Sequence, residues 1–219
     1  MKILAVDTAL GACSVAILSD EKVLAHRFVA MERGHAEALA PMVDDAIRES
    51  GLAFANLDRL GVTTGPGTFT GQRVGLAFMR GLRVALKRPL IGVTSLSAMA
   101  HQAMEEMGVD RAAALHDARR DEVYFEFVGP NVPQAGPHLF VLGAAVMELM
   151  KSAAGARVAV CGTAASRAVA GAPNLLLSKV TAPDALWVAR LAAHLPATDE
   201  APKPLYLREP DAKLPGERK

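Results

Sequence analysis

The stretch from Gly65 to Gly71 is the part of the sequence best suited to contact a ligand. It reads Gly-Pro-Gly-Thr-Phe-Thr-Gly and lies between an apolar run at residues 60–64 and a helical pattern that starts near residue 72. Glycines at such a junction let the backbone turn sharply and approach a ligand closely, so the loop could hold an anion. It lacks the Gly-Lys-Ser/Thr ending of a Walker A loop, so no lysine would reach a β- or γ-phosphate. A tightly packed turn explains the same residues equally well.

A carboxylate and a hydroxyl, Asp7 and Thr8, end the first apolar run of the chain. Such a pair at a strand end could hold a metal-bound phosphate. It could also cap the following turn through local hydrogen bonds, which is the more common use of an Asp-Thr pair. The residues of this candidate nucleotide or phosphate site are Asp7, Thr8, Gly65, Pro66, Gly67 and Thr68.

Other catalytic or metal-binding patterns are missing from the sequence. No two of the six histidines lie three to five residues apart, so no helical zinc pair exists. His35 and Glu37 imitate the His-x-Glu of zinc deaminases, but no Pro-Cys-x-x-Cys follows them. There is no Gly-x-Ser-x-Gly nucleophile elbow, and we interpret Cys13 and Cys161 as buried structural thiols. The sequence therefore predicts no metal site.

The composition is that of a globular chain, with 219 residues, 51% of them hydrophobic and 21% charged. The length suits one large domain or two small lobes. A formal net charge of +1 argues against a protein that grips nucleic acid through a broad electrostatic surface. Two cysteines cannot build a disulfide framework, and the sequence shows neither a signal peptide nor an uncharged apolar run of about 18 residues. We therefore expect a cytoplasmic protein without a membrane segment.

Hydrophobic patterning predicts a mixed sheet covered by helices in the first hundred residues. Strands at residues 3–6, 13–18 and 23–29 are joined by turns too short for a parallel crossover, so they are antiparallel. The elements that follow are a helix at 35–49, a strand at 60–64, a helix at 72–87, a strand at 90–93 and a helix at 95–107.

The second half of the chain has a less regular pattern. We predict strands at 111–115, 122–128 and 157–161, helices at 142–151 and 183–194, a Pro/Gly-rich loop at 129–137 and an irregular, docked tail from residue 196. No linker is dense enough in Pro, Gly or Ser to separate independent domains, so two lobes that share a cleft fit best.

The two helices that flank the glycine-rich loop are amphipathic, so they could cover the chain's own sheet or contact another chain. At about 100° per residue, one face of the first helix gathers His35, Leu39, Met42, Val43, Ala46 and Ile47. The apolar face of the second comprises Val74, Gly75, Phe78, Leu82, Ala85 and Leu86, with Leu76, Ala77 and Met79 outside it. We interpret the basic stripe of the second helix as solvated; it consists of Arg73, Arg80, Arg83 and Lys87.

Five segments together closely resemble the bacterial TsaB family. They are residues 2–8, 35–37, 65–76, 117–124 and 204–208, and they span essentially the whole chain in order. The resemblance implies an α/β protein with the actin/Hsp70-like ATPase fold, in which two ribonuclease-H-like lobes carry mixed sheets. We place the N-terminal lobe at residues 1–100 and a smaller C-terminal lobe at residues 101–219, with a docked tail that could return to the first lobe.

The resemblance also implies a role in making threonylcarbamoyladenosine at position 37 of tRNAs that read codons beginning with adenine. In that pathway the paralogue TsaD, helped by a TsaB-type subunit and the ATPase TsaE, transfers the threonylcarbamoyl group from an adenylate made by a separate synthase. TsaB-type proteins are regarded as the noncatalytic partner, which dimerises with TsaD, forms a homodimer when alone and reaches tRNA through the complex. The catalytic paralogue carries a His-x-x-x-His metal pair where this chain has Ser95 and Met99. A hydroxyl and a thioether hold such a cation far less well, so we expect no cofactor, with weak nucleotide binding left open.

The resemblance places the contact with the paralogue on the first and second helices. The candidate interface residues are His35, Leu39, Met42, Val43, Ala46, Gly75, Phe78, Met79 and Leu82. Some of these side chains must also cover the parent sheet. Two alternatives are an enzyme, either a nucleotide-dependent transferase or a metallopeptidase of the paralogue's type, and a standalone RNA-binding protein. The missing metal pair weighs against the first, and the presence of only two tyrosines and one tryptophan for stacking weighs against the second.

Overall fold

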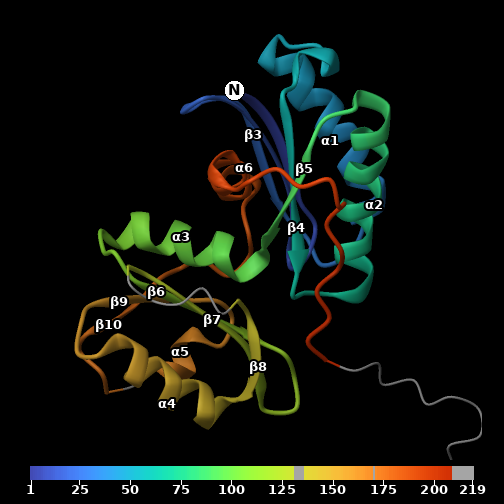
Figure 1. Cartoon of the computed structure of the whole chain (residues 1–219). Coiled ribbons are helices and arrows are strands. Elements are labelled where there is room, and N and C mark those ends of the chain that lie inside the picture. Colours follow the sequence, from blue (N-terminus) through green and yellow to red (C-terminus); the bar gives the residue numbers. More distant parts are fainter. Residues whose placement is uncertain (131–135, 170, 209–219) are drawn as a thin grey trace, which may run out of the picture.

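The computed structural model describes residues 1–130, 136–169 and 171–208, which form two five-stranded sheets with helices packed on both (Figure 1). The strand orders are β3-β2-β1-β4-β5 and β10-β9-β6-β7-β8. Each sheet contains both parallel and antiparallel pairs, so the predicted mixed α/β architecture is confirmed. No helix among the described residues is both long enough and apolar enough to cross a membrane.

The first sheet contains the strands predicted for the start of the chain. β1 pairs antiparallel with β2 and β2 with β3, whereas the β1–β4 and β4–β5 pairs are parallel. Because β1 and β4 run in the same direction, their carboxyl ends bring Asp7 and Gly65 to one edge of the sheet. The strands are β1 Lys2–Asp7, β2 Ala12–Ser19, β3 Lys22–Ala30, β4 Arg59–Gly65 and β5 Leu90–Thr94.

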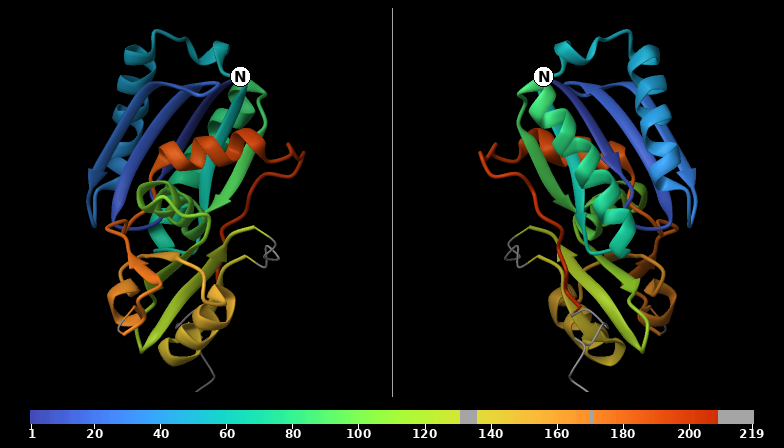
Figure 2. Two further views of the ribbon diagram at one scale, coloured as in Figure 1. Left: turned by 90° about the vertical axis from the view of Figure 1, so that its left-hand side faces the viewer. Right: turned by 90° about the vertical axis from the view of Figure 1, so that its right-hand side faces the viewer.

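Helices cover both faces of this sheet, because successive side chains of its strands point to opposite faces. α1 (His35–Ser50) and α2 (Phe69–Leu86) share with Leu4 the core on one face. α6 (Ala185–His194) shares with Ile3 the core on the other face (Figure 2). A helix from the far end of the chain therefore completes the core of the first sheet.

The second sheet is smaller and is also covered on both faces. α4 (Leu142–Ala153) and α5 (Ala165–Ala168) share one core with it, and α3 (Ser95–Met107) shares the other. α3 lies between the two sheets and follows directly from β5, so it joins the two halves of the molecule (Figure 1). The strands are β6 Ala112–Asp117, β7 Glu122–Val128, β8 His138–Val141, β9 Val158–Cys161 and β10 Leu175–Leu177.

After α6 the chain runs beside α2 toward the second sheet (Figure 1). The N–H of Leu205 donates to the carbonyl of Thr64 at 2.8 Å, and Arg208 contacts Glu122 at the start of β7. The irregular tail that the sequence predicts is therefore confirmed and docked as far as residue 208, and residues 209–219 lie outside the described part.

Several short elements differ from the predicted ones. η1 (Phe54–Asn56), α5, β8 and β10 have only three or four residues, too few to display a period of 2 or 3.6. α2 begins at Phe69 rather than near residue 72, because the Thr68 hydroxyl accepts a hydrogen bond from the N–H of Gly71 and caps the helix. Of the loop predicted at 129–137, residues 131–135 lie outside the described residues.

Candidate functional site

Asp7 is fully buried at the end of β1. Its Oδ1 accepts hydrogen bonds from the Thr63 hydroxyl (2.6 Å) and from the N–H of Ala9 (3.1 Å), whereas Oδ2 has no partner among the described residues. Burial raises the pKa of the Asp7 carboxyl to about 7, because the ionised form loses its hydration there. The hydrogen bond that Asp7 accepts from Ala9 caps the turn after β1, which is the more common of the two roles predicted for this residue.

Thr8 joins the turn after β1 to the first turns of α2. Its hydroxyl donates to the carbonyl of Gly71 (2.7 Å) and accepts from the N–H of Gly75 (3.0 Å). The side chain is 1% exposed. The hydroxyl that could have held a phosphate is therefore used within the protein as both donor and acceptor.

The glycines of the loop and of α2 allow close contact with the turn after β1. A Cβ at Gly67 would lie 2.3 Å from the carbonyl oxygen of Ala9, and a Cβ at Gly71 would lie 2.2 Å from that of Thr8. The N–H of Thr68 donates to the same Ala9 carbonyl at 2.8 Å. These contacts make the loop a tightly packed turn, one of the two interpretations of its sequence. Nucleotide binding at this loop stays a prediction.

The two positions that the resemblance matches to the paralogue's metal pair are used in packing. Ser95, at the start of α3, is fully buried and donates its hydroxyl hydrogen to the carbonyl of Pro66. Met99 is also fully buried, in the core between α3 and the second sheet. Within the described ranges, no three His, Cys, Asp or Glu side chains gather where they could hold a metal ion. The side chains of Ser95 and Met99 are therefore not accessible to a ligand.

The turn after β9 resembles the first turn in its close packing. Gly162 has φ +97°, and a Cβ there would lie 2.2 Å from the carbonyl oxygen of Leu115. The hydroxyl of Thr163 accepts a hydrogen bond from the N–H of Asp117 at 2.9 Å. A glycine is therefore needed here because the chain folds back on its own backbone.

Both cysteines are free thiols buried in the protein. Burial raises the pKa of Cys13 to about 11 and also raises the pKa of Cys161. A thiol with a raised pKa holds little of the reactive thiolate at neutral pH. The interpretation of both residues as structural thiols is confirmed.

The apolar face of α1 covers the chain's own sheet. Leu39, Val43 and Ala46 are at most 1% exposed and belong to the core of the first sheet. The ring of His35 is buried as well, with Nε2 at 3.1 Å from a backbone carbonyl. The structure therefore corrects the assignment of these four residues to a partner interface. Met42 is half-buried at the margin of the same core.

The face that α2 turns to the sheet overlaps the predicted apolar face but is shifted toward Leu76 and Met79. Leu76 and Met79 are buried in the core, whereas Ala85 of the predicted apolar face is exposed. Gly75 belongs to the predicted face and is buried where a Cβ would lie 2.7 Å from the Thr8 hydroxyl oxygen, so the helix rests on this small residue. The assignment of Gly75 and Met79 to an interface is therefore corrected.

Two residues of the predicted interface on α2 keep some exposure. Phe78 and Leu82 are half-buried and pack at the edge of the core that α1 and α2 share. Together with Met42 they are the predicted interface residues that a partner could still reach. Their contact with another chain stays a prediction.

Two arginines of the basic stripe on α2 hold the tail, so its interpretation as a solvated face is corrected for these two, whereas Arg73 and Lys87 are exposed. Arg80 Nε donates to the carbonyl of Pro202 at 3.1 Å, and Arg83 contacts the carbonyl of Asp199. The sequence gives little signal for this role, because the acceptors are backbone carbonyls that every residue carries.

An exposed aromatic pair fixes the tail to the start of α2. Phe69 and Tyr206 stack with ring centroids 5.8 Å apart and are 58% and 47% exposed. The guanidinium of Arg73 lies 3.4 Å from the Phe69 ring centroid, and its Nε donates to the Tyr206 hydroxyl at 2.8 Å. Arg73 therefore contributes both a cation–π contact and a hydrogen bond.

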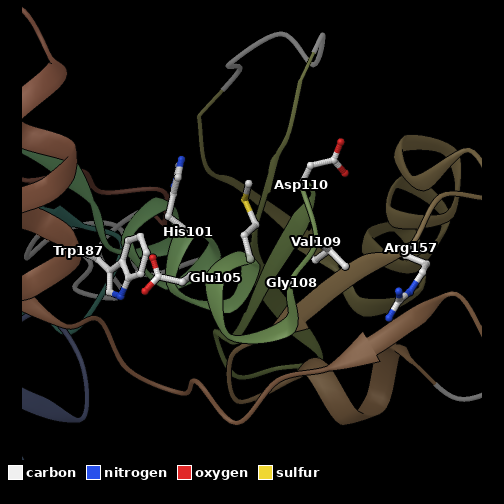
Figure 3. Close-up of a pocket in the computed structure, with 8 residues that line it drawn as sticks. His101, Glu105, Gly108, Val109, Asp110, Arg157 and Trp187 are labelled. Atoms are coloured by element: carbon white, nitrogen blue, oxygen red, sulfur yellow. The ribbon is translucent and has the colours of Figure 1, made fainter.

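A wide groove of about 870 Å³ lies between α3, α6 and the second sheet, away from all of the predicted site residues. Trp187 and Glu105 lie on one side of it, and Asp110 and Arg157 lie on the other (Figure 3). Arg190 pairs with Glu105 at 3.1 Å and stacks 4.5 Å from the Trp187 ring centroid. Sequence patterns did not reveal the groove, because only the fold brings its residues together.

Known proteins resemble the chain in both sequence and fold. The family model described as TsaD, tRNA N6-adenosine threonylcarbamoyltransferase, matches residues 23–214. The tRNA threonylcarbamoyladenosine biosynthesis protein TsaB of Escherichia coli (strain K12) is 42% identical over 125 residues, which cover 57% of this chain and 54% of that protein. The structure titled YeaZ from Pseudomonas aeruginosa has a TM-score of 0.75 at 30% identity, over 88% of this chain and 90% of that one. The chain belongs to the TsaB family.

Two further proteins match nearly the whole length of the chain. A crystal structure of an uncharacterized protein with similarity to peptidase YEAZ, from Pseudomonas aeruginosa, has a TM-score of 0.82 at 32% identity, over 94% and 99% of the two chains. An uncharacterized protein of Mycobacterium tuberculosis is 36% identical over 213 residues, which cover 96% of this chain and 93% of that protein. The chain matches about half the length, 54%, of the TsaB proteins from Escherichia coli and Haemophilus influenzae.

The fold that the resemblance implies is confirmed. Component A of (R)-2-hydroxyglutaryl-CoA dehydratase from Acidaminococcus fermentans shares the fold at a TM-score of 0.51 and 13% identity, over 88% of this chain and 97% of that one. Together with the two Pseudomonas structures, this likeness assigns the TsaB-family chain to the actin/Hsp70-like ATPase fold.

Proposed function

We propose that the protein takes part in the biosynthesis of threonylcarbamoyladenosine in tRNA, as a noncatalytic subunit that pairs with a TsaD-type paralogue. The similarity to the Escherichia coli protein named for this pathway supports the proposal, and so does the family model that matches most of the chain. In the proposed complex the paralogue transfers the threonylcarbamoyl group to adenosine 37, a TsaE-type ATPase assists, and tRNA is reached through the complex. The chain acts in the cytoplasm and forms a homodimer in the absence of the paralogue.

The observation that carries the noncatalytic role is the burial of Ser95 and Met99. A metal-dependent transferase needs ligands that face an open site, and here both positions are fully buried in packing contacts. The hydroxyl of Thr8 and the amides of Thr68 and Gly71 are likewise bonded within the chain. These contacts support a protein that provides a binding surface for its partner rather than catalytic groups.

The outward surface of α1 and α2 suits the packing of helices from a partner. We define this surface by Ala40 on α1 and by Ala77, Gly81 and Val84 on α2, all exposed, with Val84 at 73%. A Cβ at Gly81 would meet nothing within 4 Å, so the surface has room for side chains of another chain. Small residues let helix axes approach closely, and close approach increases the dispersion contacts between helices.

Pairing can be tested with a charge on this surface. Ala77→Arg places a long cation at the centre of the proposed interface, where burial without a partner is unfavourable. We expect the dissociation constant for the TsaD-type paralogue, measured by sedimentation velocity, to rise at least tenfold. Met147→Arg is the matched control, because Met147 is 76% exposed on α4 of the second sheet. Circular dichroism should show both variants folded like the parent.

Equal effects of the two variants, or unchanged binding by a folded Ala77→Arg protein, would place the partner elsewhere. Absence of any complex between the parent protein and the paralogue would contradict the proposed function itself.

A further inference from the structure

A second hollow in the molecule, smaller than the open groove and more enclosed, lies on the other side of α3 from Ser95 and Met99. Its volume is about 350 Å³, within the range of roughly 300–1,000 Å³ that small-molecule sites occupy. Its walls come from the end of β5, the first turns of α3, β7 and the end of α6. Both halves of the molecule therefore contribute to it.

One carboxyl group dominates the polar part of this cavity. Glu126 of β7 is 9% exposed, and its Oε2 accepts a hydrogen bond from the Thr94 hydroxyl at 2.6 Å. Thr94 is the N-cap of α3, and its hydroxyl also accepts a hydrogen bond from the N–H of Ser97 in the first turn at 3.0 Å. The N-terminus of α3 thus fixes the carboxyl group at the wall of the cavity.

The charge of the cavity is complementary to a cation. Among the described residues that line it, none is Lys or Arg, and the other titratable side chains are His101 and His194. His101 Nδ1 lies 2.8 Å from the Ser97 carbonyl, which can only accept, so this nitrogen carries the proton. Burial raises the pKa of Glu126 to about 7, so the carboxylate is ionised above that pH, and no Lys or Arg among the described lining residues faces it.

The remaining wall is apolar and offers space for a short hydrocarbon chain. Val93, Phe127 and Leu191 belong to it, from β5, β7 and α6 respectively. A largely apolar wall with a few converging polar groups is the usual composition of a small-molecule site. Support of the α3 cap accounts for the hydrogen bond between Thr94 and Glu126, but it does not require a cavity beside the carboxylate.

We propose that this cavity binds a small molecule that carries a primary ammonium group on a short apolar chain. The ammonium donates to the carboxylate of Glu126, and the chain packs against Val93, Phe127 and Leu191. Neither the family resemblance nor the proposed pairing with the paralogue places a ligand here.

The test uses n-butylammonium as the probe and n-butanol as its uncharged counterpart. Methyl-labelled protein is titrated with each compound at pH 8 and followed by nuclear magnetic resonance. We expect saturable shifts of the Val93 and Leu191 methyl signals with the amine, and at least tenfold weaker binding of the alcohol. At pH 5.5 the amine should also bind at least tenfold more weakly, because Glu126 is then protonated.

Two variants separate the carboxylate from the cavity. Glu126→Gln should weaken amine binding at least tenfold, and Glu21→Gln, on the exposed turn between β2 and β3, is the matched control with no effect. Ser97→Leu keeps Glu126 and fills the cavity, so it should abolish binding of both compounds and decides the matter if Glu126→Gln does not fold. No saturable shift in the parent, or equal amine binding by the parent and by a folded Glu126→Gln or Ser97→Leu variant, would overturn the proposal.

Discussion

At the scale of single residues, burial of the Asp7 carboxyl makes the free energy of unfolding depend on pH. Its pKa rises from 3.8 to about 7, so the folded protein holds a proton between these pH values that the unfolded chain has released. The free energy of unfolding therefore falls as pH rises from about 4 to 7, and the loss is complete above pH 7. Asp7→Asn removes this dependence. Its unfolding free energy, relative to that of the parent, should be higher at pH 8 than at pH 4 by up to about 4 kcal/mol, at about 1.36 kcal/mol per pKa unit.

Urea denaturation at the two pH values checks this expectation. The replacement leaves an amide at the position of the unpartnered Oδ2, which changes stability by an amount independent of pH, so only the difference between the two pH values is informative. A difference of zero would show that the pKa of Asp7 is not raised in the folded protein.

Gly67 in the loop before α2 and Gly81 within α2 make a matched pair for testing how tightly the loop is packed. At Gly67 a new Cβ would lie 2.3 Å from the Ala9 carbonyl oxygen, whereas at Gly81 it would meet nothing within 4 Å. Gly67→Ala should lower the unfolding free energy by about 1–3 kcal/mol through overpacking. Gly81→Ala, in the middle of α2, should raise it by about 0.5–1 kcal/mol through helix propensity. Chemical denaturation measures both, and similar effects at the two positions would mean that the loop does not pack on Ala9.

At the scale of elements, α2 organises the tail through its arginines. Arg80 donates to the Pro202 carbonyl, and a hydrogen bond from a charged group contributes about 1.5–3 kcal/mol. Arg80→Met should therefore release the tail while the two sheets stay folded. We expect the amide of Leu205, which donates to Thr64 in the parent, to exchange its hydrogen at least tenfold faster.

Hydrogen exchange followed by mass spectrometry reports this change, with Arg48→Met as the control. Arg48 is exposed on α1 and pairs with Asp44 and Asp45, so its loss removes the same charge without touching the tail. Unchanged exchange of Leu205 in Arg80→Met, or an equal increase in the control, would show that docking of the tail does not depend on Arg80.

The sequence predicted the long elements well and their orientation less well. Strands of the first sheet and the helices around it have clear periods of 2 and 3.6, so their existence follows from local pattern. The exact orientation of α2 did not follow, because Leu76 and Met79 lie outside the apolar face that the helical period indicates, yet both are buried in the core. The contacts of Arg80 and Arg83 with the tail could not be predicted either, because their acceptors are backbone carbonyls, which every residue carries.

At the scale of the whole molecule, the two sheets are linked by segments that return from distant parts of the chain. α6 completes the core of the first sheet, and the tail passes from that sheet to Glu122 of the second. The predicted lobes at residues 1–100 and 101–219 therefore share structure, because the last described segments of the second range pack on the first sheet. The exposed surface of α1 and α2 and the packing of Ser95 and Met99 in the core support the proposed role as a partner of a TsaD-type paralogue.

The most direct test of this account is a reconstitution with defined components. A tRNA transcript, threonylcarbamoyl-adenylate, a TsaD-type paralogue and a TsaE-type ATPase are incubated with and without this protein. Threonylcarbamoyladenosine is then measured by mass spectrometry of the digested tRNA. We predict that the modified nucleoside forms when this protein and the paralogue are both present, and that this protein without the paralogue forms none. Modification by this protein in the absence of the paralogue, or equal modification when this protein is omitted, would contradict its role as a required noncatalytic subunit.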